Sequence, residues 1–395
     1  MERYIERYVR LVIDVQLQLI EGDMLSINTE ERSMAFARLL AQEATIITRL
    51  PVTIVETKRG KVLQAYPIDP EVKDLFRPEE GQPVMCRIVD LDLPFTKSGG
   101  ASFSEICDSA ATLAEYGLLA DPIFLDRRVA SPWANIPYPG PYWAEAEIGH
   151  NVLEREAWEF FAKILRLDSE HCSSFWLQQA NLLSWRKQRL DPLEGAELML
   201  TGDGYSLSAR LAEQTHFYSG SVTLNGGRTF IPILPIQSLA GSLAATSASG
   251  SIVASEAFWV MGAEVVGASF EVVDGKVISW SAERGKEALD AFFGIDAGAS
   301  QLSAIFLADA NTIESQNLRV GIHPHFSTTG HTSVSFGGFL IDTLNQSVDE
   351  EGLAACDLAD SLVRLSVPIG SDALQVAFIV DGEEIRMIEE GVFHE

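Results

Sequence analysis

Cysteine is scarce in this chain, and its few cysteines stand far apart. They are Cys86, Cys107, Cys172 and Cys356. Structural zinc sites and dithiol redox sites need cysteine pairs with CxxC-type spacing, so the sequence argues against both. Isolated cysteines are typically reduced and buried. We therefore expect free thiols and no structural zinc.

Long apolar runs are missing too. No stretch approaches the roughly 18 residues needed to cross a bilayer. The N-terminal residues 1–7 are charged and lack the apolar core and small-residue cleavage site of a secretory signal. The sequence therefore predicts a cytoplasmic protein without a membrane segment.

Basic residues are few relative to acidic ones. The chain has 29 Lys and Arg against 56 Asp and Glu, which gives a formal net charge of −27. Binding to nucleic acid or to an anionic membrane needs clustered Lys and Arg, so neither is expected as a partner. The acidic excess indicates solubility. A basic partner, such as a cationic peptide, is the alternative.

Familiar catalytic signatures are absent. The chain has no GxSxG elbow, no HExxH pair, and no P-loop or GxGxxG after a strand. Its one histidine cluster is His323, His325 and His331. Three imidazoles can begin a metal site, but such a site also needs carboxylates or thiols that converge with them. Because Pro324 splays the first two, a polar loop that lines a cleft or faces solvent is the alternative.

The first half of the chain alternates between helical and strand patterns. A strand, a helix and a strand in succession predict a βαβ unit with a parallel sheet. Four prolines within residues 131–143 predict an irregular, aromatic loop there. The predicted helices cover residues 3–20, 34–40, 103–116, 151–166 and 173–187, and the predicted strands cover residues 24–28, 52–55, 84–89 and 122–125.

The second half is rich in short alternating strands. Strong turn signals stand at Asp203-Gly204, Asn225-Gly226, Asp274-Gly275 and Asp381-Gly382. A helix over residues 281–293 interrupts the strands. The sequence thus predicts an α/β domain with a parallel sheet over residues 1–192 and a β-rich α+β domain over residues 193–395.

Arg364 stands in an otherwise apolar, alternating run. Alternation places Leu362, Arg364 and Ser366 on one face of the predicted strand. A guanidinium on such a face usually pairs with a carboxylate. That carboxylate belongs either to an acid of this chain, such as Asp342 or Asp360, or to a ligand that Arg364 grips.

Several segments resemble the thermophilic-type leucyl aminopeptidases, a family of metallopeptidases with two cooperating metal ions. The similar segments are Tyr8–Val12 with Glu21–Ile27, Phe36–Leu40 with Glu43-Ala44, Asp274–Val277 with Ser281–Gly285, Val380–Gly382, and Gly391–Phe393. The resemblance covers nearly the whole chain. It implies an aminopeptidase-like two-domain fold and a homodimer.

The resemblance also implies that the metal ligands of that family are replaced here. Gln237 and Ser238 stand at the place of one glutamate, and Ala304 or Leu318 at the place of another. Ser333 stands at the place of a histidine in a Gly-x-x-His-x-x-x-Gly strand. Arg364-Leu365-Ser366 replaces a His-x-Asp pair, which also excludes the iron-dependent dihydroxypyridine dioxygenases that resemble this frame.

These replacements lead to three hypotheses. The first is a protein without catalytic residues, metal or cofactor, whose cleft binds a peptide through Arg364, Ser366, Ser333, Gln237, Ser238, His331, His323 and His325. Its ligand is then a peptide or protein, including a precursor peptide presented to a modifying enzyme in peptide natural product biosynthesis. The second is an active metalloenzyme whose ligands have moved to the three histidines. The third is a scaffold in which the dimer surface matters and the cleft does not.

Overall fold

The computed structural model describes residues 1–57, 83–92, 130–326, 330–345, 356–361 and 363–394. The predicted helix over 103–116 and strand over 122–125 lie outside these residues. Contacts divide the chain into two compact units. Of the described residues, those up to 180 and residues 220–236 belong to the first unit, and residues 181–219 and those from 237 onward belong to the second.

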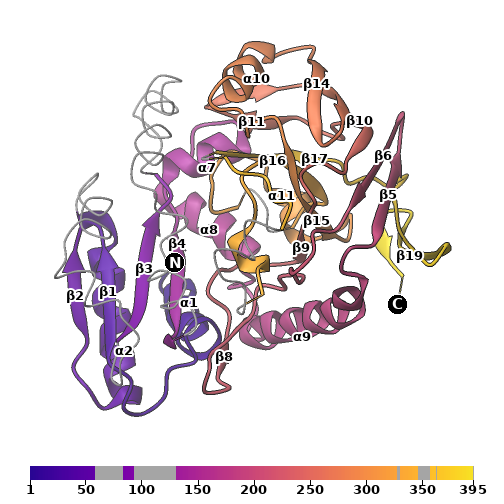
Figure 1. Ribbon diagram of the computed structural model, residues 1–395. Coiled ribbons are helices and arrows are strands. Elements are labelled where there is room, and N and C mark those ends of the chain that lie inside the picture. Colours follow the sequence, from indigo (N-terminus) through magenta and orange to yellow (C-terminus); the bar gives the residue numbers. More distant parts are fainter. Residues whose placement is uncertain (58–82, 93–129, 327–329, 346–355, 362, 395) are drawn as a thin grey trace. The chain divides into compact units, whose positions relative to one another are not determined.

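The first unit is built on a four-stranded parallel sheet with the strand order β2-β1-β3-β4 (Figure 1). Helix α2 connects β1 to β2 and packs on both strands. This is the predicted βαβ unit. The strands are β1 Leu25–Thr29, β2 Thr53–Glu56, β3 Val84–Asp90 and β4 Trp133–Tyr138, and α2 covers Met34–Thr48.

Helices and aromatic side chains form the core around this sheet. The helices are α1 Glu2–Leu11, which continues as a π-helix over Val12–Gln16, then α7 Pro141–Ile148, α8 Glu154–Ile164 and α9 Cys172–Leu190 up to Ala180. The buried ring of Tyr8 stacks on Phe36 and meets Phe161 edge-on. The helices predicted over residues 3–20, 151–166 and 173–187 are therefore present.

The prediction of an irregular loop over residues 131–143 is wrong. Residues 133–138 form β4, and Pro137 lies in register with Val89 of β3. Because β4 is the last strand of its sheet, Pro137 is tolerated despite its missing N–H. Pro141 opens α7, where the first N–H of a helix has no intrahelical partner to lose.

The second unit contains an eight-stranded antiparallel sheet, with the order β14-β13-β10-β6-β5-β18-β19-β20. Two-residue turns at Asp203-Gly204, Asp274-Gly275 and Asp381-Gly382 join three of its hairpins, as predicted. Its strands are β5 Glu197–Gly202, β6 Tyr205–Arg210, β10 Ser249–Val253, β13 Ser269–Val273, β14 Lys276–Ser281, β18 Gln375–Val380, β19 Glu383–Glu389 and β20 Val392–Phe393.

A separate four-stranded antiparallel sheet carries four of the eight candidate site residues, Ser238, Ser333, Arg364 and Ser366. Its order is β17-β16-β15-β9. The second unit also contains the short helices α10 and α11. The elements are β9 Ser238–Ser242, β15 Leu302–Ala308, β16 Ser333–Gly337, β17 Arg364–Pro368, α10 Lys286–Phe293 and α11 Ile313–Asn317. Strands β7 Val222–Thr223 and β8 Thr229–Phe230 form a small hairpin around the predicted Asn225-Gly226 turn. Strands β11 Phe258–Val260 and β12 Ala263–Val265 form another.

The parallel sheet of the first unit and the antiparallel sheets of the second confirm the predicted fold class. The helix predicted over 281–293 begins later, at Lys286, because Ser281 still pairs with Ser269 and Gly285 is left-handed. Residues 220–236 join the first unit. The division into an α/β domain over residues 1–192 and a β-rich domain over residues 193–395 stays a prediction.

Two sequence-level exclusions can be checked in the described part of the chain. No described helix is long and apolar enough to span a membrane. Cys86, Cys172 and Cys356 are free and buried. These thiols agree with the expectation drawn from their spacing.

Gly275 and Gly382 occupy equivalent turns but differ in their surroundings. Both have left-handed φ, at +78° and +82°. A Cβ at Gly275 would lie 1.7 Å from the carbonyl oxygen of Ala245, whereas nothing lies within 4 Å of one at Gly382. We expect Gly382→Ala to cost about 1–2 kcal/mol, the strain of a left-handed alanine. Gly275→Ala should cost at least about 3 kcal/mol, since the backbone must also move. Urea unfolding of both variants measures the difference, and equal losses would contradict this account.

Candidate functional site

Several positions at which the resemblance implies replaced metal ligands lie on one face of the four-stranded sheet. In an antiparallel sheet, residues directly opposite each other share a face, and so do alternate residues along a strand. The register pairs Ala308 with Ser238, Phe306 with Ser333, Ala304 with Ser335, Ser335 with Ser366 and Gly337 with Arg364. Ser238, Ala304, Ser333, Ser366 and Arg364 therefore belong to the same face. Leu318, the other candidate, follows α11 and is not in this sheet.

Apolar side chains occupy part of this face. Ala304 packs with Ala240, Phe306 and Leu340 in a buried cluster, and Tyr218 lies against it. A carboxylate at position 304 would face methyl groups and rings. This surrounding would disfavour a charged metal ligand, because a buried charge needs polar partners.

The hydroxyl groups on the same face satisfy one another in part. The Ser335 and Ser366 hydroxyls are 2.9 Å apart and hydrogen-bonded. The Ser242 and Thr343 hydroxyls are bonded at 2.7 Å. Neutral hydroxyl pairs of this kind can accept or donate to a ligand, but they bring no charge to balance a metal ion.

Arg364 is the charged residue of this face. Its side chain is exposed, and it forms no ion pair with a carboxylate in the described residues. The surrounding protein desolvates its guanidinium and lowers the pKa of Arg364, while Asp342 acts in the opposite sense. Of the two acids predicted as internal partners, Asp342 acts through space and neither is in direct contact. The guanidinium therefore keeps its donors available for a ligand.

Gln237 links this sheet to α11. The Gln237 side-chain oxygen accepts a hydrogen bond from the backbone N–H of Ile313 at 2.9 Å. The Thr312 hydroxyl caps the same helix by accepting from Ser315 N at 3.0 Å, and it donates to the carbonyl of Gly330 at 2.6 Å. Gln237 thus has a structural contact that sequence reasoning did not foresee.

Glu314 is a buried acid that the sequence did not single out. It is fully buried, and neither carboxyl oxygen has a hydrogen-bond partner among the described residues. Its side chain leaves no room at Gly330, where a Cβ would lie 2.8 Å from Oε2. Burial raises the pKa of Glu314 to about 8. One acid in a short polar turn looks like an ordinary solvated residue in the sequence, so no local signal identified it.

His331 and Ser333 carry the other unpartnered polar atoms of this region. The Nδ1 atom of buried His331 lies 3.2 Å from a carboxylate oxygen of Glu256. In the part of the chain that the structure describes, neither Nε2 of His331 nor the buried hydroxyl of Ser333 has a hydrogen-bond partner. With Glu256 ionised, Nδ1 carries the proton and Nε2 is an acceptor.

His323 has the opposite arrangement. Its Nδ1 accepts a hydrogen bond from the backbone N–H of His325 at 3.1 Å, which places the proton on Nε2. Burial, and secondarily His325, lowers the pKa of His323 to about 3, so the ring is neutral. The His325 ring meets Phe326 edge-on. No group of three or more His, Cys, Asp or Glu among the described residues is arranged to hold a metal ion.

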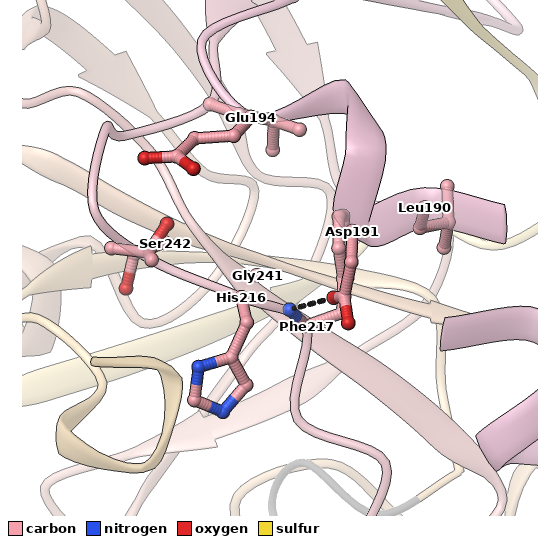
Figure 2. Close-up of a pocket in the computed structure, with 9 residues that line it drawn as sticks. Leu190, Asp191, Glu194, His216, Phe217, Gly241 and Ser242 are labelled. Carbon is pink, nitrogen blue, oxygen red and sulfur yellow. Dashed lines mark hydrogen bonds between the residues drawn. The ribbon is translucent and has the colours of Figure 1, made fainter. Parts of the chain in front are cut away.

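A small pocket of the second unit lies elsewhere on β9, beside Gly241 and Ser242 (Figure 2). Its volume of about 10 Å³ suits a single water molecule. Asp191 accepts from Phe217 N at 2.9 Å and pairs with Lys187, and Glu194 accepts from Gln214 N. Because its two acids already have partners, this pocket has the character of a hydration site.

The buried carboxyl of Glu314 makes stability depend on pH. Its folded-state pKa of about 8 lies above the usual 4.5, so the folded state holds a proton that the unfolded state releases. The stability is fully present below about pH 4.5 and is lost as pH rises towards 8. Each pH unit in this window should remove up to about 1.4 kcal/mol of the free energy of unfolding.

Glu314→Gln should abolish this pH-dependent part of the stability in urea unfolding between pH 5 and about 8. Glu287→Gln, on the exposed face of α10, is the control; parallel curves for all three proteins would contradict the assignment.

Comparisons with known proteins agree with this architecture. The family model described as thermophilic metalloprotease (M29) matches residues 1–393. Aminopeptidase 2 of Geobacillus stearothermophilus is 23% identical over 290 residues, 72% of this chain and 68% of the relative. Aminopeptidase T of Thermus thermophilus is 25% identical over 264 residues, 66% of this chain and 64% of the relative. The structure of wild-type AmpT from Thermus thermophilus superposes with a TM-score of 0.78 at 20% identity and covers 99% of both chains. The chain belongs to the thermophilic metalloprotease family M29.

Proposed function

We propose that this chain is a non-catalytic, aminopeptidase-like protein that binds a peptide. The observation that carries the proposal is Arg364, an exposed residue that shares a face of the sheet with Ser333 and Ser366 and whose guanidinium has no carboxylate contact among the described residues. A fixed cation stands where the family resemblance expects a metal-binding imidazole. With a guanidinium in this place, the face is suited to bind an anion and not a cation.

The donor set on this face is poor for two divalent cations. A pair of such ions about 3.5–4 Å apart needs several carboxylates to offset its charge. Ser238, Ala304, Ser333 and Ser366 supply none, and Arg364 adds a positive charge. Hydrolysis by the two-metal route is thus disfavoured by both charge and ligand type.

A carboxylate is the ligand group that suits Arg364. Guanidinium and carboxylate form two parallel, charge-assisted hydrogen bonds. The serine hydroxyls and the Gln237 amide offer neutral contacts to the rest of a ligand. Because the relatives are named aminopeptidases, a peptide is the ligand class that the frame favours.

The strand geometry suggests how long that peptide is. Arg364 lies opposite Gly337, at the far end of β16 from Ser333. Four residues of strand span about 13 Å, and an extended peptide of about four residues has the same length. Because every residue of β16 is buried, a peptide with its carboxylate at Arg364 would reach Ser333 and the neighbouring His331 only after the groups that cover β16 move aside.

A fold that binds a peptide without hydrolysing it suggests a more specific biological role. We propose that the ligand is a precursor peptide, held for a modifying enzyme in peptide natural product biosynthesis. Residence in the cytoplasm and a homodimeric state belong to the same proposal. His323 and His325 would contribute polar surface in this arrangement and would not bind a metal.

A metalloenzyme with relocated histidine ligands is the second candidate, and His331 favours it. Metal-binding histidines usually donate their other N–H to a carboxylate, as the contact of His331 with Glu256 permits. His323 opposes it, since its proton sits on the nitrogen that would have to bind the metal. Among the described residues, His331 belongs to no group of three or more His, Cys, Asp or Glu that could hold a metal ion.

Isothermal titration with tetrapeptides tests the binding mode. We expect Arg364→Ala to weaken binding of a peptide acid at least tenfold, since a charge-assisted hydrogen bond contributes about 1.5–3 kcal/mol. Arg284→Ala, which removes an exposed arginine bound to Glu264, should change nothing. Amidation of the peptide's C-terminus should weaken binding to the wild type but have no further effect in Arg364→Ala. Equal affinity of Arg364→Ala and wild type would remove Arg364 from the site.

Elemental analysis separates the two candidates. Protein purified without a histidine tag or chelator should contain well under one equivalent of transition metal, because the face lacks anionic ligands. It should also release no product from leucine anilides after addition of zinc, cobalt or iron. One firmly bound equivalent that is lost in His331→Ala would support the relocated metal site instead.

A further inference from the structure

The β7–β8 hairpin of the first unit turns at Asn225-Gly226, the single Asn-Gly pair of the chain. The N–H of Gly227 donates to the carbonyl of Leu224 at 2.8 Å, and the N–H of Leu224 donates to the carbonyl of Arg228 at 2.8 Å. Gly227 is left-handed, with φ at +84°. A turn followed by a left-handed glycine is a common form of three-residue hairpin loop. Asn225 and Gly226 therefore occupy the two central positions of the turn.

Little in the surroundings of this turn restrains its two central residues. Asn225 and Gly226 are exposed. Nothing lies within 4 Å of a Cβ placed at Gly226 or at Gly227. The backbone N–H of Gly226 donates to no carbonyl in the part of the chain that the structure describes. Because glycine has no Cβ to obstruct the approach, rotation within the turn can bring the Gly226 nitrogen to the side-chain carbonyl carbon of Asn225.

We propose that Asn225 is a site of spontaneous deamidation that yields isoaspartate. The Gly226 nitrogen attacks Cγ of Asn225 and gives up its proton. The bond from Cγ to the side-chain nitrogen then breaks, and ammonia leaves with that proton. A five-membered succinimide ring remains, and one water molecule opens it at either carbonyl to give aspartate or isoaspartate. The net reaction consumes water and releases ammonia, so it needs no enzyme, oxidant or cofactor.

Three Asp-Gly turns of the eight-stranded sheet show how the surroundings control this chemistry. Aspartate forms the same ring with loss of water, again by attack of the next backbone nitrogen. At Asp203-Gly204 and Asp381-Gly382, nothing lies within 4 Å of a Cβ placed at the glycine. At Asp274-Gly275, the glycine N–H donates to the carbonyl of Ala248 at 2.7 Å, and a Cβ would lie 1.7 Å from the carbonyl oxygen of Ala245. The attacking nitrogen is held in place there, so this turn is protected.

The product acts on Arg228, the residue that follows the turn. Arg228 donates to the two carboxylate oxygens of Asp23 at 3.0 and 2.8 Å, and to the carbonyl of Leu17 at 3.0 Å. Isoaspartate adds a methylene group to the backbone between Leu224 and Arg228, whose hydrogen bond closes the loop. The new carboxylate also competes with Asp23 for the guanidinium. The modification therefore loosens the contacts between the hairpin and the chain that follows the first helix.

The hydrogen bonds of the turn determine the expected rate. Rotation of Asn225 towards Gly226 breaks the bond from Gly227 to Leu224 and leaves the rest of the first unit in place. The loss of one such bond slows the reaction about fivefold relative to an unstructured peptide. The protected turn at Asp274-Gly275 reacts only after a larger local opening, so it should be modified at least about tenfold more slowly than the two exposed Asp-Gly turns.

Incubation of the full-length protein at mildly alkaline pH tests the proposal. Peptide mapping by mass spectrometry measures deamidation, and a protein isoaspartyl methyltransferase with labelled S-adenosylmethionine measures isoaspartate. Asn225 should convert within about tenfold of the rate in a synthetic peptide of residues 222–230. Asn225→Gln, which would need a six-membered ring, and Gly226→Ala, whose Cβ hinders attack, should each lower that rate at least about tenfold. Asn181, an exposed helical residue followed by leucine, is the internal control and should stay intact.

Three outcomes overturn the proposal. The first is that Asn225 stays intact while the peptide converts, the second is equal conversion of Asn225 and Asn181, and the third is an unchanged rate in Gly226→Ala. Urea unfolding tests the consequence for Arg228: aged wild type should unfold at lower urea than fresh wild type, and aged Asn225→Gln should show no such loss. Equal losses in both aged proteins would contradict it. The proposed peptide binding by Arg364 is tested separately from all of these results.

Discussion

The register of the four-stranded sheet β17-β16-β15-β9 is the constraint on which the interpretation of this protein depends. It fixes Ser238, Ala304, Ser333, Ser366 and Arg364 on one face, although they are spread over 129 positions of the chain. A shift by one residue on any strand would turn that strand's side chains to the other face. The hydrogen-bonded ladder thus brings five residues from four strands to a single surface.

The side chains around this surface fit the residues that it carries. Ala304 is accommodated by an apolar cluster with Phe306 and Leu340, and Ser366 by its bond to Ser335. A carboxylate returned to position 304 alone would lack polar partners. The residues on this face therefore fit one another, and a metal ligand introduced at position 304 would require changes in the packing around it as well.

The sequence predicted the parallel sheet, the β-rich second half and the Asp-Gly turns, because each of them produces a local residue pattern that few other structures share. It was wrong about residues 131–143, since proline counting ignores that an edge strand and a first helical turn both accept proline. Glu314 was missed because burial is a tertiary property. The absence of direct contact between Arg364 and Asp342 was also invisible, as it depends on where two distant segments lie.

The polar side chains on β16 and on the segments next to it are of two kinds, and the two kinds have different consequences for binding and stability. Arg364 is an exposed residue with a charged, partly desolvated guanidinium, so it can bind a ligand's carboxylate through charge-assisted hydrogen bonds. Glu314, His331 and Ser333 are buried with unpartnered atoms, and such atoms destabilise the folded state unless a proton or another group satisfies them. For Glu314 the raised pKa means that a proton takes this role near neutral pH. A peptide that displaced the groups covering β16 would reach the end of the strand where His331 and Ser333 still have unpartnered atoms in the described chain. Ligand binding and the relief of an unfavourable burial would then occur at the same strand.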